Sequence, residues 1–179
     1  MPVRSRASSA AWSTEFLPDT RLITAWRLVK SRHARAAFDG EGARLYGGRW
    51  NSPGTRVAYA SDSVALAALE VLAHLQSTAV LQTYSLATIR FPESLVETLD
   101  PASLPSEWRR FPSPPENQAI GDTWVAESRS LVLRVPSAIV PSASNYLINP
   151  AHARFVAAVT ETPERFAFDP RLLKRLRQG

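Results

Sequence analysis

One carboxylate stands alone within an otherwise apolar stretch of this sequence. Residues 63–74 (SVALAALEVLAH) contain Glu70 as their only formally charged side chain. A helix that is apolar on all sides is usually buried, and a buried carboxylate is costly unless it is paired or hydrogen-bonded. Glu70 is therefore either the partner of an arginine or a functional carboxylate at the floor of a cleft, held near a developing positive charge. The residues alone leave both interpretations open.

A second concentration of useful side chains lies in residues 47–54 (GGRWNSPG). Adjacent glycines allow a sharp turn or a close approach of the backbone to a ligand. The guanidinium of Arg49 suits phosphate or carboxylate, Trp50 offers a stacking face, and the Asn51 amide both donates and accepts hydrogen bonds. An ordinary hairpin loop with its tryptophan in the core is the alternative. The concentration of these functions in eight residues favours a ligand site.

Four further residues are weaker candidates. Tyr59 lies in a short apolar strand and is either a core residue or a stacking platform. Arg27 lies in mid-strand, where a charge is out of place unless it faces a cleft or solvent. Ser137 follows a proline, and Asn145 follows a run of small residues. Hydroxyls and amides at such positions more often form turns than contact ligands.

Several familiar chemistries are absent from the sequence. There are no cysteines, which excludes disulfides, thiolate catalysis and cysteine-ligated metals. The three histidines, His33, His74 and His152, are far apart, so we expect no metal site. Gly40-Glu41-Gly42 begins like a dinucleotide fingerprint but lacks its third glycine, and neither a phosphate-binding loop nor a GxSxG elbow is present.

The net charge is positive, and nearly all of the basic residues are arginines. The 179 residues carry a net charge of +5, and Lys30 and Lys174 are the only lysines. Such a balance suits anionic partners without naming them. A nucleic-acid-binding module is one alternative, but the arginines are scattered and no known nucleic-acid-binding signature appears. We therefore expect no direct contact with nucleic acid.

The elements that must position these residues alternate between strands and helices, which predicts an α+β fold with a mixed sheet and a few helices. Strands are expected at 22–29, 56–60, 83–91 and 131–140, the last interrupted by Pro136. Helices are expected at 63–74, capped by Asp62 or Ser61, at 117–128 despite Gly121, and after Asp169-Pro170. Residues 38–55 hold five of the seven glycines and are expected to form a shaped loop.

The chain is expected to form one domain, residues 21–179, preceded by a flexible arm, residues 1–20. The arm lacks the apolar centre of a secretory signal. No apolar run approaches the ~20 residues that a membrane span requires. A cytoplasmic location without membrane contact is the expectation.

Taken in order, these segments resemble the RES-domain family. The resemblance covers nearly the whole chain after residue 21, and its motifs follow the family's order and spacing. They are Trp26-Arg27, residues 40–61 (GEGARLYGGRWNSPGTRVAYAS), 65–74 (ALAALEVLAH), 120–124 (IGDTW), 131–141 (LVLRVPSAIVP), 145–152 (NYLINPAH) and 168–172 (FDPRL).

The resemblance implies a toxin of a type II toxin–antitoxin module, with a fold similar to the ADP-ribosyltransferase toxins. It implies NAD⁺ as the substrate, consumed by a phosphorylase or glycohydrolase or used for protein ADP-ribosylation, with inorganic phosphate as a possible co-substrate and no metal. An Xre-type helix-turn-helix antitoxin is the implied partner, in an assembly that can be a higher oligomer. DNA contact would then occur only through the antitoxin.

The resemblance also implies roles for residues. Arg49, Tyr59 and Glu70 match the family's Arg–Tyr–Glu active-site set, and Ser137, Asn145 and Arg27 match further positions of the site. On this interpretation Arg49 and Arg27 anchor the pyrophosphate, Tyr59 stacks on the nicotinamide, and Glu70 stabilises an oxocarbenium-like transition state.

One position departs from the family pattern. The family usually has an acidic residue just before the NYL motif, where this chain has Ser144. That puts local contacts in doubt but leaves the Arg–Tyr–Glu set intact.

Overall fold

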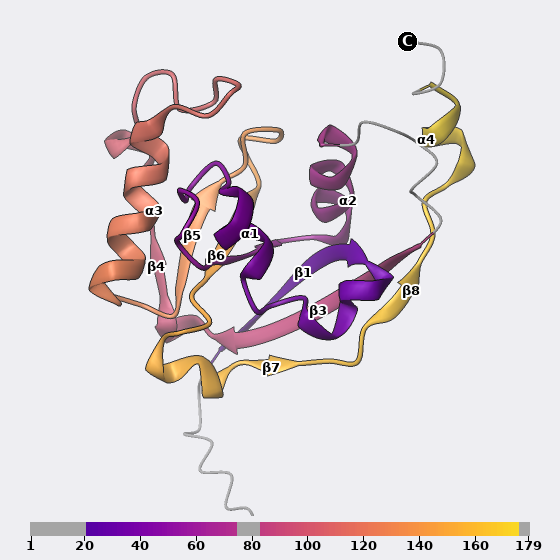
Figure 1. Ribbon diagram of the computed structural model, residues 1–179, viewed down its shortest axis with the longest axis horizontal. Coiled ribbons are helices and arrows are strands. Elements are labelled where there is room, and N and C mark those ends of the chain that lie inside the picture. The colour runs from indigo at the N-terminus through magenta and orange to yellow at the C-terminus, as the bar shows by residue number, and fades with distance from the viewer. Residues whose placement is uncertain (1–20, 75–82, 176–179) are drawn as a thin grey trace, which may run out of the picture.

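The computed structural model describes residues 21–74 and 83–175, which form one curled mixed sheet with helices packed around it (Figure 1). The strand order is β4-β5-β6-β2-β1-β3-β7, and β8 also pairs with β3. All pairings are antiparallel except that of β4 with β5, which confirms the α+β class and the mixed sheet. The strands are β1 (Leu22–Lys30), β2 (Ala58–Ser61), β3 (Tyr84–Pro92), β4 (Val96–Thr98), β5 (Val132–Pro136), β6 (Ser144–Ile148), β7 (Val159–Thr160) and β8 (Glu164–Phe166).

The curl of the sheet arises between β1 and β2. β1 pairs with β3 along its whole length, from Leu22 opposite Pro92 to Lys30 opposite Tyr84. The same strand meets β2 at a single register pair, Trp26 opposite Ser61. In Figure 1, β1 and β3 therefore run across the view while β5 and β6 stand steeply. The two halves of the sheet are turned relative to one another.

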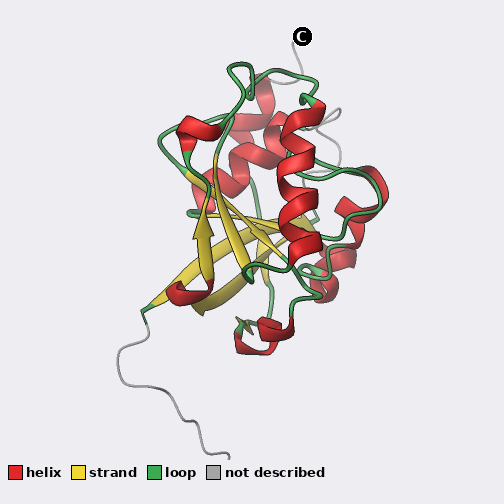
Figure 2. Ribbon diagram, turned by 90° about the vertical axis from the view of Figure 1, so that its left-hand side faces the viewer, coloured by secondary structure: helices red, strands yellow, loops and turns green. Residues whose placement is uncertain are grey.

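Four α-helices surround this sheet within the described residues. Figure 2, in which the left-hand side of Figure 1 faces the viewer, shows the long helix α3 in front of the strands. The helix α2 stands at the other end of the sheet and packs against β1. The helices are α1 (Glu41–Tyr46), α2 (Val64–Ala73), α3 (Pro115–Glu127) and α4 (Pro170–Arg175), with 3₁₀ turns at Ser31–Ala36, Glu93–Leu95, Pro101–Ser103 and Ala153–Ala157.

Most of the elements expected from sequence are present. The predicted strands at 22–29, 56–60 and 83–91 correspond to β1, β2 and β3, and the predicted helices correspond to α2, α3 and α4. The predicted strand at 131–140 is shorter, because β5 ends at Pro136. Asp169 accepts the backbone N–H of Arg171 at 2.8 Å, which confirms it as the cap of α4. The expected arm, residues 1–20, lies outside the described residues.

Three details differ from the expectation. The glycine-rich stretch 38–55 is not all loop, because α1 forms within it, entered through Gly40 at φ 73°. Asn145 lies in a strand and not in a turn, since β6 runs between β2 and β5, and its last three residues are all buried, so no polar alternation marks it. The cap of α2 is Ser63, whose side chain accepts the N–H of Leu66 at 3.2 Å, and not Asp62 or Ser61.

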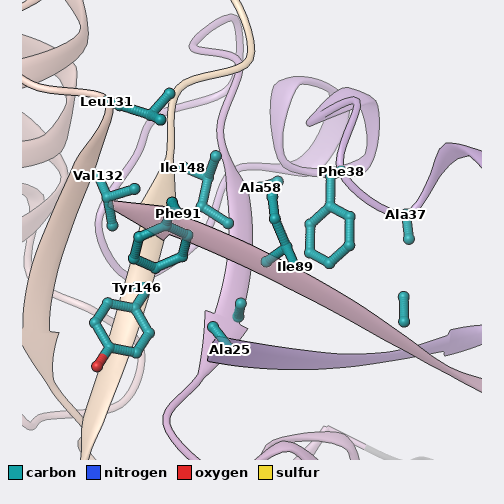
Figure 3. Close-up of a cluster of buried hydrophobic side chains, with 12 residues drawn as sticks. Ala25, Ala37, Phe38, Ala58, Ile89, Phe91, Leu131, Val132, Tyr146 and Ile148 are labelled. Atoms are coloured by element: carbon teal, nitrogen blue, oxygen red, sulfur yellow. The ribbon is translucent and has the colours of Figure 1, made fainter. Parts of the chain in front are cut away.

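The core divides into clusters on the two faces of the sheet. One cluster joins β1, β2, β3, β5 and β6 with the segment before α1, and Figure 3 shows Phe91 beside Tyr146 at its centre. Their rings meet edge-on, with centroids 5.5 Å apart. A second cluster lies beneath α3 and contains Trp50 and Trp124, both almost fully buried. This second cluster fixes the loop that carries the candidate site.

Candidate active site

The Glu70 carboxylate is held by neutral hydrogen-bond donors. Its Oε1 accepts the Ser137 hydroxyl at 3.0 Å and the Asn145 amide Nδ2 at 2.6 Å. Within the described residues Glu70 forms no salt bridge, and both of these bonds use the same oxygen, so Oε2 faces no protein donor. Of the two sequence interpretations, the arginine ion pair is therefore absent. One oxygen of the carboxylate is therefore left unengaged by described residues.

Strand pairing explains why these three residues meet although they are distant in sequence. β6 pairs with β2 so that Asn145 lies opposite Ser61, and the Ser61 hydroxyl donates to Asn145 Oδ1 at 2.8 Å. β5 pairs with β6 up to Pro136 opposite Ser144. Beyond that pair the chain turns, and Ser137 Oγ accepts the backbone N–H groups of Ile139 and Val140 at 3.1 and 3.2 Å. The turn fixes the hydroxyl that donates to Glu70.

The Tyr59 hydroxyl is the centre of a second network, inside the 47–54 loop. It donates to Asn51 Oδ1 at 2.7 Å and accepts the N–H of Trp50 at 3.1 Å. A Cβ atom at Gly48 would lie 2.6 Å from this hydroxyl, so only glycine fits there. Gly47 is needed for a different reason, since its φ is 69°. Tyr59 therefore shapes the loop that presents Arg49.

The predictions that Trp50 stacks on a ligand and that Asn51 contacts one are wrong. The Trp50 side chain is 2% exposed and lies in the core cluster beneath α3, with its ring centroid 5.9 Å from that of Trp108. Asn51 is fully buried, and its Nδ2 donates to the carbonyls of Ala43, Ser52 and Thr55. Both side chains support the loop from the protein interior, and neither presents a surface to a substrate.

Arg27 also lies differently from the prediction. Its Nη1 donates to the backbone carbonyl of Tyr59 at 2.7 Å, in the gap where β1 and β2 diverge. Burial lowers the pKa of Arg27, and Tyr59 and Asp39 partly oppose this. Its Nε is buried without a partner in the described part of the chain. Arg27 thus positions the Tyr59 backbone, and direct contact with a pyrophosphate is not what its geometry provides.

Arg49 is oriented by backbone carbonyls and not by a carboxylate. Its Nη1 donates to the carbonyls of Trp108 and Arg110 at 2.6 and 3.1 Å, and its own carbonyl accepts the Ser113 hydroxyl at 3.0 Å. Burial lowers the pKa of Arg49, the charges of Glu70 and Tyr59 raise it, and Arg109 lowers it further. Arg49 therefore lies within electrostatic range of Glu70 and of a second guanidinium, with Nε and Nη2 not engaged by described residues.

Residues of α3 that the sequence did not single out lock this loop in place. Gln118 Nε2 donates to the Gly48 carbonyl at 3.1 Å, and Asp122 Oδ1 accepts the N–H of Ser52 at 2.9 Å. Burial raises the pKa of Asp122, but hydrogen bonds from Ser52 and Thr55 outweigh it, so that the pKa is lowered. Gly121 lies between these two residues. The available signal was a helical glycine with polar residues at i−3 and i+1, which share one helix face.

The position that departs from the family pattern has a substitute for the missing acid. The N–H of Ser144 donates to Asp62 Oδ2 at 2.7 Å, and the N–H of Asp62 donates to the Ser144 carbonyl at 3.0 Å. A carboxylate therefore does lie beside residue 144, contributed by the end of β2. The start of β6, and with it Asn145, is held from that side.

Burial of the Tyr59 phenol predicts a dependence of stability on alkaline pH. Desolvation raises the pKa of Tyr59 far above its ordinary value of 10.0, against the opposing effects of the Trp50 N–H and of Arg27. The unfolded chain therefore loses this proton near pH 10 while the folded chain keeps it. The stabilising contribution is complete below that pH and is lost as the pH rises above it.

We expect Tyr59→Phe to show a flatter fall in stability above pH 10 than the unaltered protein. At pH 7 the variant should be less stable by about 1–3 kcal/mol, because the buried Asn51 and Trp50 groups lose their partner. Urea unfolding at pH 7 and at pH 10.5 measures both effects. Tyr46→Phe is the matched control, since that ring is 84% exposed. An equal pH slope in Tyr59→Phe and the unaltered protein would contradict the assignment.

The surface hollows and the distribution of metal-ligating residues add to the description of the site. Two hollows in the described surface, one lined by residues between Pro105 and Glu116 and one by Ala34–Asp39 with residues of the far edge, include none of Arg49, Tyr59 or Glu70. In the described ranges no three His, Asp or Glu side chains gather as a metal site would require, and no helix is long and apolar enough to span a membrane.

The curled sheet with its surrounding helices is a class of small α+β fold that is already known from a solved bacterial protein. The fold is similar to that in the crystal structure of the M. tuberculosis MbcT–MbcA toxin–antitoxin complex, with a TM-score of 0.69 over 89% of this chain and 91% of that one, at 23% identity. Residues 24–169 match the RES domain, and the chain belongs to the RES domain family.

Curated relatives agree with this membership. The chain is 40% identical over 148 residues to the protein named Toxin Res of Yersinia enterocolitica serotype O:8 / biotype 1B, which covers 82% of this chain and 97% of that protein. It is 34% identical over 155 residues to the Prs ADP-ribosylating toxin of a Sphingobium species, covering 84% and 96%. The family that the motifs resembled is thereby confirmed.

Proposed function

We propose that this protein is the toxin of a toxin–antitoxin pair and that its site cleaves the nicotinamide–ribose bond of NAD⁺. The observation that carries the proposal is the Glu70 carboxylate, held by Ser137 and Asn145 with one oxygen unengaged by described residues, in electrostatic range of Arg49. The names of the relatives, two of which state a toxin and an ADP-ribosylating toxin, support the same assignment.

The chemistry requires charges of both signs, and the site supplies them. When the bond between the ribose C1 and the nicotinamide nitrogen breaks, its electron pair neutralises the pyridinium, and positive charge develops on the ribose ring. A carboxylate that accepts from the ribose 2-hydroxyl stabilises that charge, as in glycoside hydrolysis. Preorganised groups of this kind contribute several kcal/mol each. Glu70 has this role in the proposal.

The other residues bind and position. Arg49 donates to the pyrophosphate, because a guanidinium forms charge-assisted and often bidentate bonds to phosphate. The ring of Tyr59, whose hydroxyl is committed to the loop, can offer only its face, and an aromatic face attracts the cationic nicotinamide by ~0.5–2 kcal/mol. Ser137 and Asn145 hold Glu70, and Arg27 supports Tyr59 from the backbone side.

The acceptor of the ADP-ribosyl group defines two candidate reactions. With inorganic phosphate or water, one oxygen bonds to C1, and the products are nicotinamide with ADP-ribose-1-phosphate or with ADP-ribose and a proton. With a protein nucleophile the product is an ADP-ribosylated protein. The name of the Sphingobium relative favours this second candidate, which uses the same cleavage step.

Product analysis tests the proposal directly. Purified protein is incubated with NAD⁺ alone, with NAD⁺ and phosphate, and with NAD⁺ and a bacterial lysate, and the products are identified by mass spectrometry. We expect nicotinamide release in at least one reaction, and the second product names the acceptor. No loss of NAD⁺ in any of the three would exclude the proposed function.

The implied partner is a cognate antitoxin of the Xre helix-turn-helix type, acting in the cytoplasm, where NAD⁺ is available. Support comes from the solved relative in fold, which is described as a toxin–antitoxin complex. Expression of this chain alone should arrest growth, and co-expression with a small helix-turn-helix protein, where the adjacent gene encodes one, should restore it. Size-exclusion chromatography with light scattering of the pair would measure whether a higher oligomer forms.

A further inference from the structure

A second arginine, which the sequence motifs did not include, reaches the turn that holds Glu70. Arg109 lies in the proline-rich segment between the 3₁₀ turn Pro101–Ser103 and α3. Its Nε and Nη2 donate to the carbonyl of Ala138 at 3.2 and 3.1 Å. Ala138 directly follows Ser137, whose hydroxyl donates to Glu70. The head group of Arg109 is therefore anchored one residue from the Glu70 network.

The backbone on both sides of Arg109 also orients Arg49. Nη1 of Arg49 donates to the carbonyls of Trp108 and Arg110, the two residues that flank Arg109. Arg109 is close enough for its charge to lower the pKa of Arg49, after the larger effect of burial. The two guanidiniums, each oriented by backbone carbonyls, are thus close enough for their charges to interact.

No carboxylate of the described residues compensates the charges of these two guanidiniums. Neither Arg49 nor Arg109 pairs with a carboxylate in the described part of the chain, whereas seven arginines do: Arg21, Arg44, Arg56, Arg90, Arg110, Arg129 and Arg171. A backbone carbonyl orients a guanidinium without neutralising it. Placing two uncompensated like charges close together is unfavourable, and a bound anion removes that penalty.

The geometry points to a two-guanidinium subsite, formed by Arg109 together with Arg49, that binds a phosphate group beside Glu70. This inference rests on the proposed function, which supplies two sources of such a group: the pyrophosphate of NAD⁺ and free inorganic phosphate as acceptor. Nη1 of Arg109 and Nε and Nη2 of Arg49 are the donors that no described residue engages. Arg109 is a binding residue in this assignment, distinct from the groups that stabilise the ribose.

Three substitutions separate a charge role from a structural one. Arg109→Gln keeps a neutral N–H donor for the Ala138 carbonyl but removes the charge. Arg109→Lys keeps the charge. Arg90→Gln is the matched control, because Arg90 on β3 is exposed and is paired at 2.5 Å with Glu161.

Binding is measured by titration calorimetry with two probes, ADP for the pyrophosphate and inorganic phosphate for the acceptor. For Arg109→Gln we expect binding of one probe to weaken by about tenfold or more, as loss of a charge-assisted hydrogen bond implies. Arg109→Lys should retain most of the affinity, and Arg90→Gln should bind as the unaltered protein does. Weakened ADP binding assigns the subsite to the pyrophosphate, and weakened phosphate binding assigns it to the acceptor.

The subsite is overturned if Arg109→Gln binds both probes as tightly as the unaltered protein, or if the Gln and Lys variants lose affinity equally. The second outcome would mean that Arg109 only fastens the two loops together. Titration needs no turnover, so the result is independent of the product analysis. A protein that consumes no NAD⁺ but needs Arg109 for phosphate binding would refute the proposed function and leave the subsite standing.

Discussion

Replacement of Glu70 by glutamine is expected to reduce the turnover of NAD⁺ by about two decades or more, while NAD⁺ binding changes by less than about threefold. Glutamine has the same shape, and its Oε1 can still accept from Ser137 and Asn145, so the hydrogen-bond network is retained. What is lost is the negative charge that stabilises the developing ribose cation. An effect on the transition state alone lowers kcat and leaves the dissociation constant of the substrate nearly unchanged.

The measurement is kcat from nicotinamide release, together with the Kd of NAD⁺ by titration at a temperature where turnover is negligible. Glu164→Gln is the matched control, because Glu164 is an exposed glutamate on β8, in the half of the sheet away from β5 and β6. That variant should turn over at the unaltered rate. Wild-type kcat in Glu70→Gln, or a loss explained by weaker NAD⁺ binding alone, would refute the role assigned to Glu70.

Glu70 could be singled out from the sequence because its signal is local. A single charge in an apolar helix has to be either compensated or used, and that much follows from residues 63–74 alone. The same reasoning could not show which residues donate hydrogen bonds to Glu70. Ser137 and Asn145 come close to it only through the pairing of β2, β6 and β5. Local periodicity carries no information on which strand lies beside which.

The errors within the 47–54 loop have a different physical origin. Arg49, Trp50 and Asn51 are adjacent in sequence and look like one ligand-binding unit, but consecutive residues of an irregular loop point in different directions. Trp50 packs in the core beneath α3, and the Asn51 amide donates its hydrogen bonds to backbone carbonyls. Of the three, only Arg49 has side-chain donors that no described residue engages. Residue types show what a loop can do, and packing decides which residue does it.

Arg27 illustrates the same limit in a strand. The sequence predicts that the guanidinium of Arg27, within β1, faces a cleft or solvent, and the family resemblance implies contact with a ligand. In the structure it donates a hydrogen bond to the Tyr59 carbonyl, where β1 and β2 separate. Where the two strands diverge, the Tyr59 carbonyl has no backbone partner on β1, and Arg27 donates to it instead. No pattern in the sequence shows where two strands diverge.

Substitution of Gly121 by alanine is expected to lower the free energy of unfolding by about 3 kcal/mol or more, the upper range for an overpacked core. A Cβ atom at this position would lie 1.7 Å from the carbonyl oxygen of Trp50 and 2.9 Å from its carbonyl carbon. Both are backbone atoms, so no side-chain rotation can relieve the clash. Either α3 or the 47–54 loop has to shift.

A shift of that loop also reaches the chemistry. Gln118 and Asp122, on either side of Gly121, hold the carbonyl of Gly48 and the N–H of Ser52. Arg49 lies between these two anchors, so its guanidinium would move with them. We therefore expect the variant that does fold to show a raised KM for NAD⁺ as well as a lowered unfolding midpoint in urea.

Gly42→Ala is the matched control, because it makes the same substitution in a helix with nothing within 4 Å of the new Cβ. Alanine is the better helix former by about 1 kcal/mol, so this variant should be as stable as the unaltered protein or slightly more so. The two variants are thus expected to change stability in opposite directions. If Gly121→Ala were also stabilising, intrinsic helix propensity would outweigh the contact with Trp50, and the loop would not depend on α3 for its position. A destabilised Gly121→Ala beside an unaffected Gly42→Ala would mean that the glycine retained in α3 is required by the close approach of the Arg49 loop.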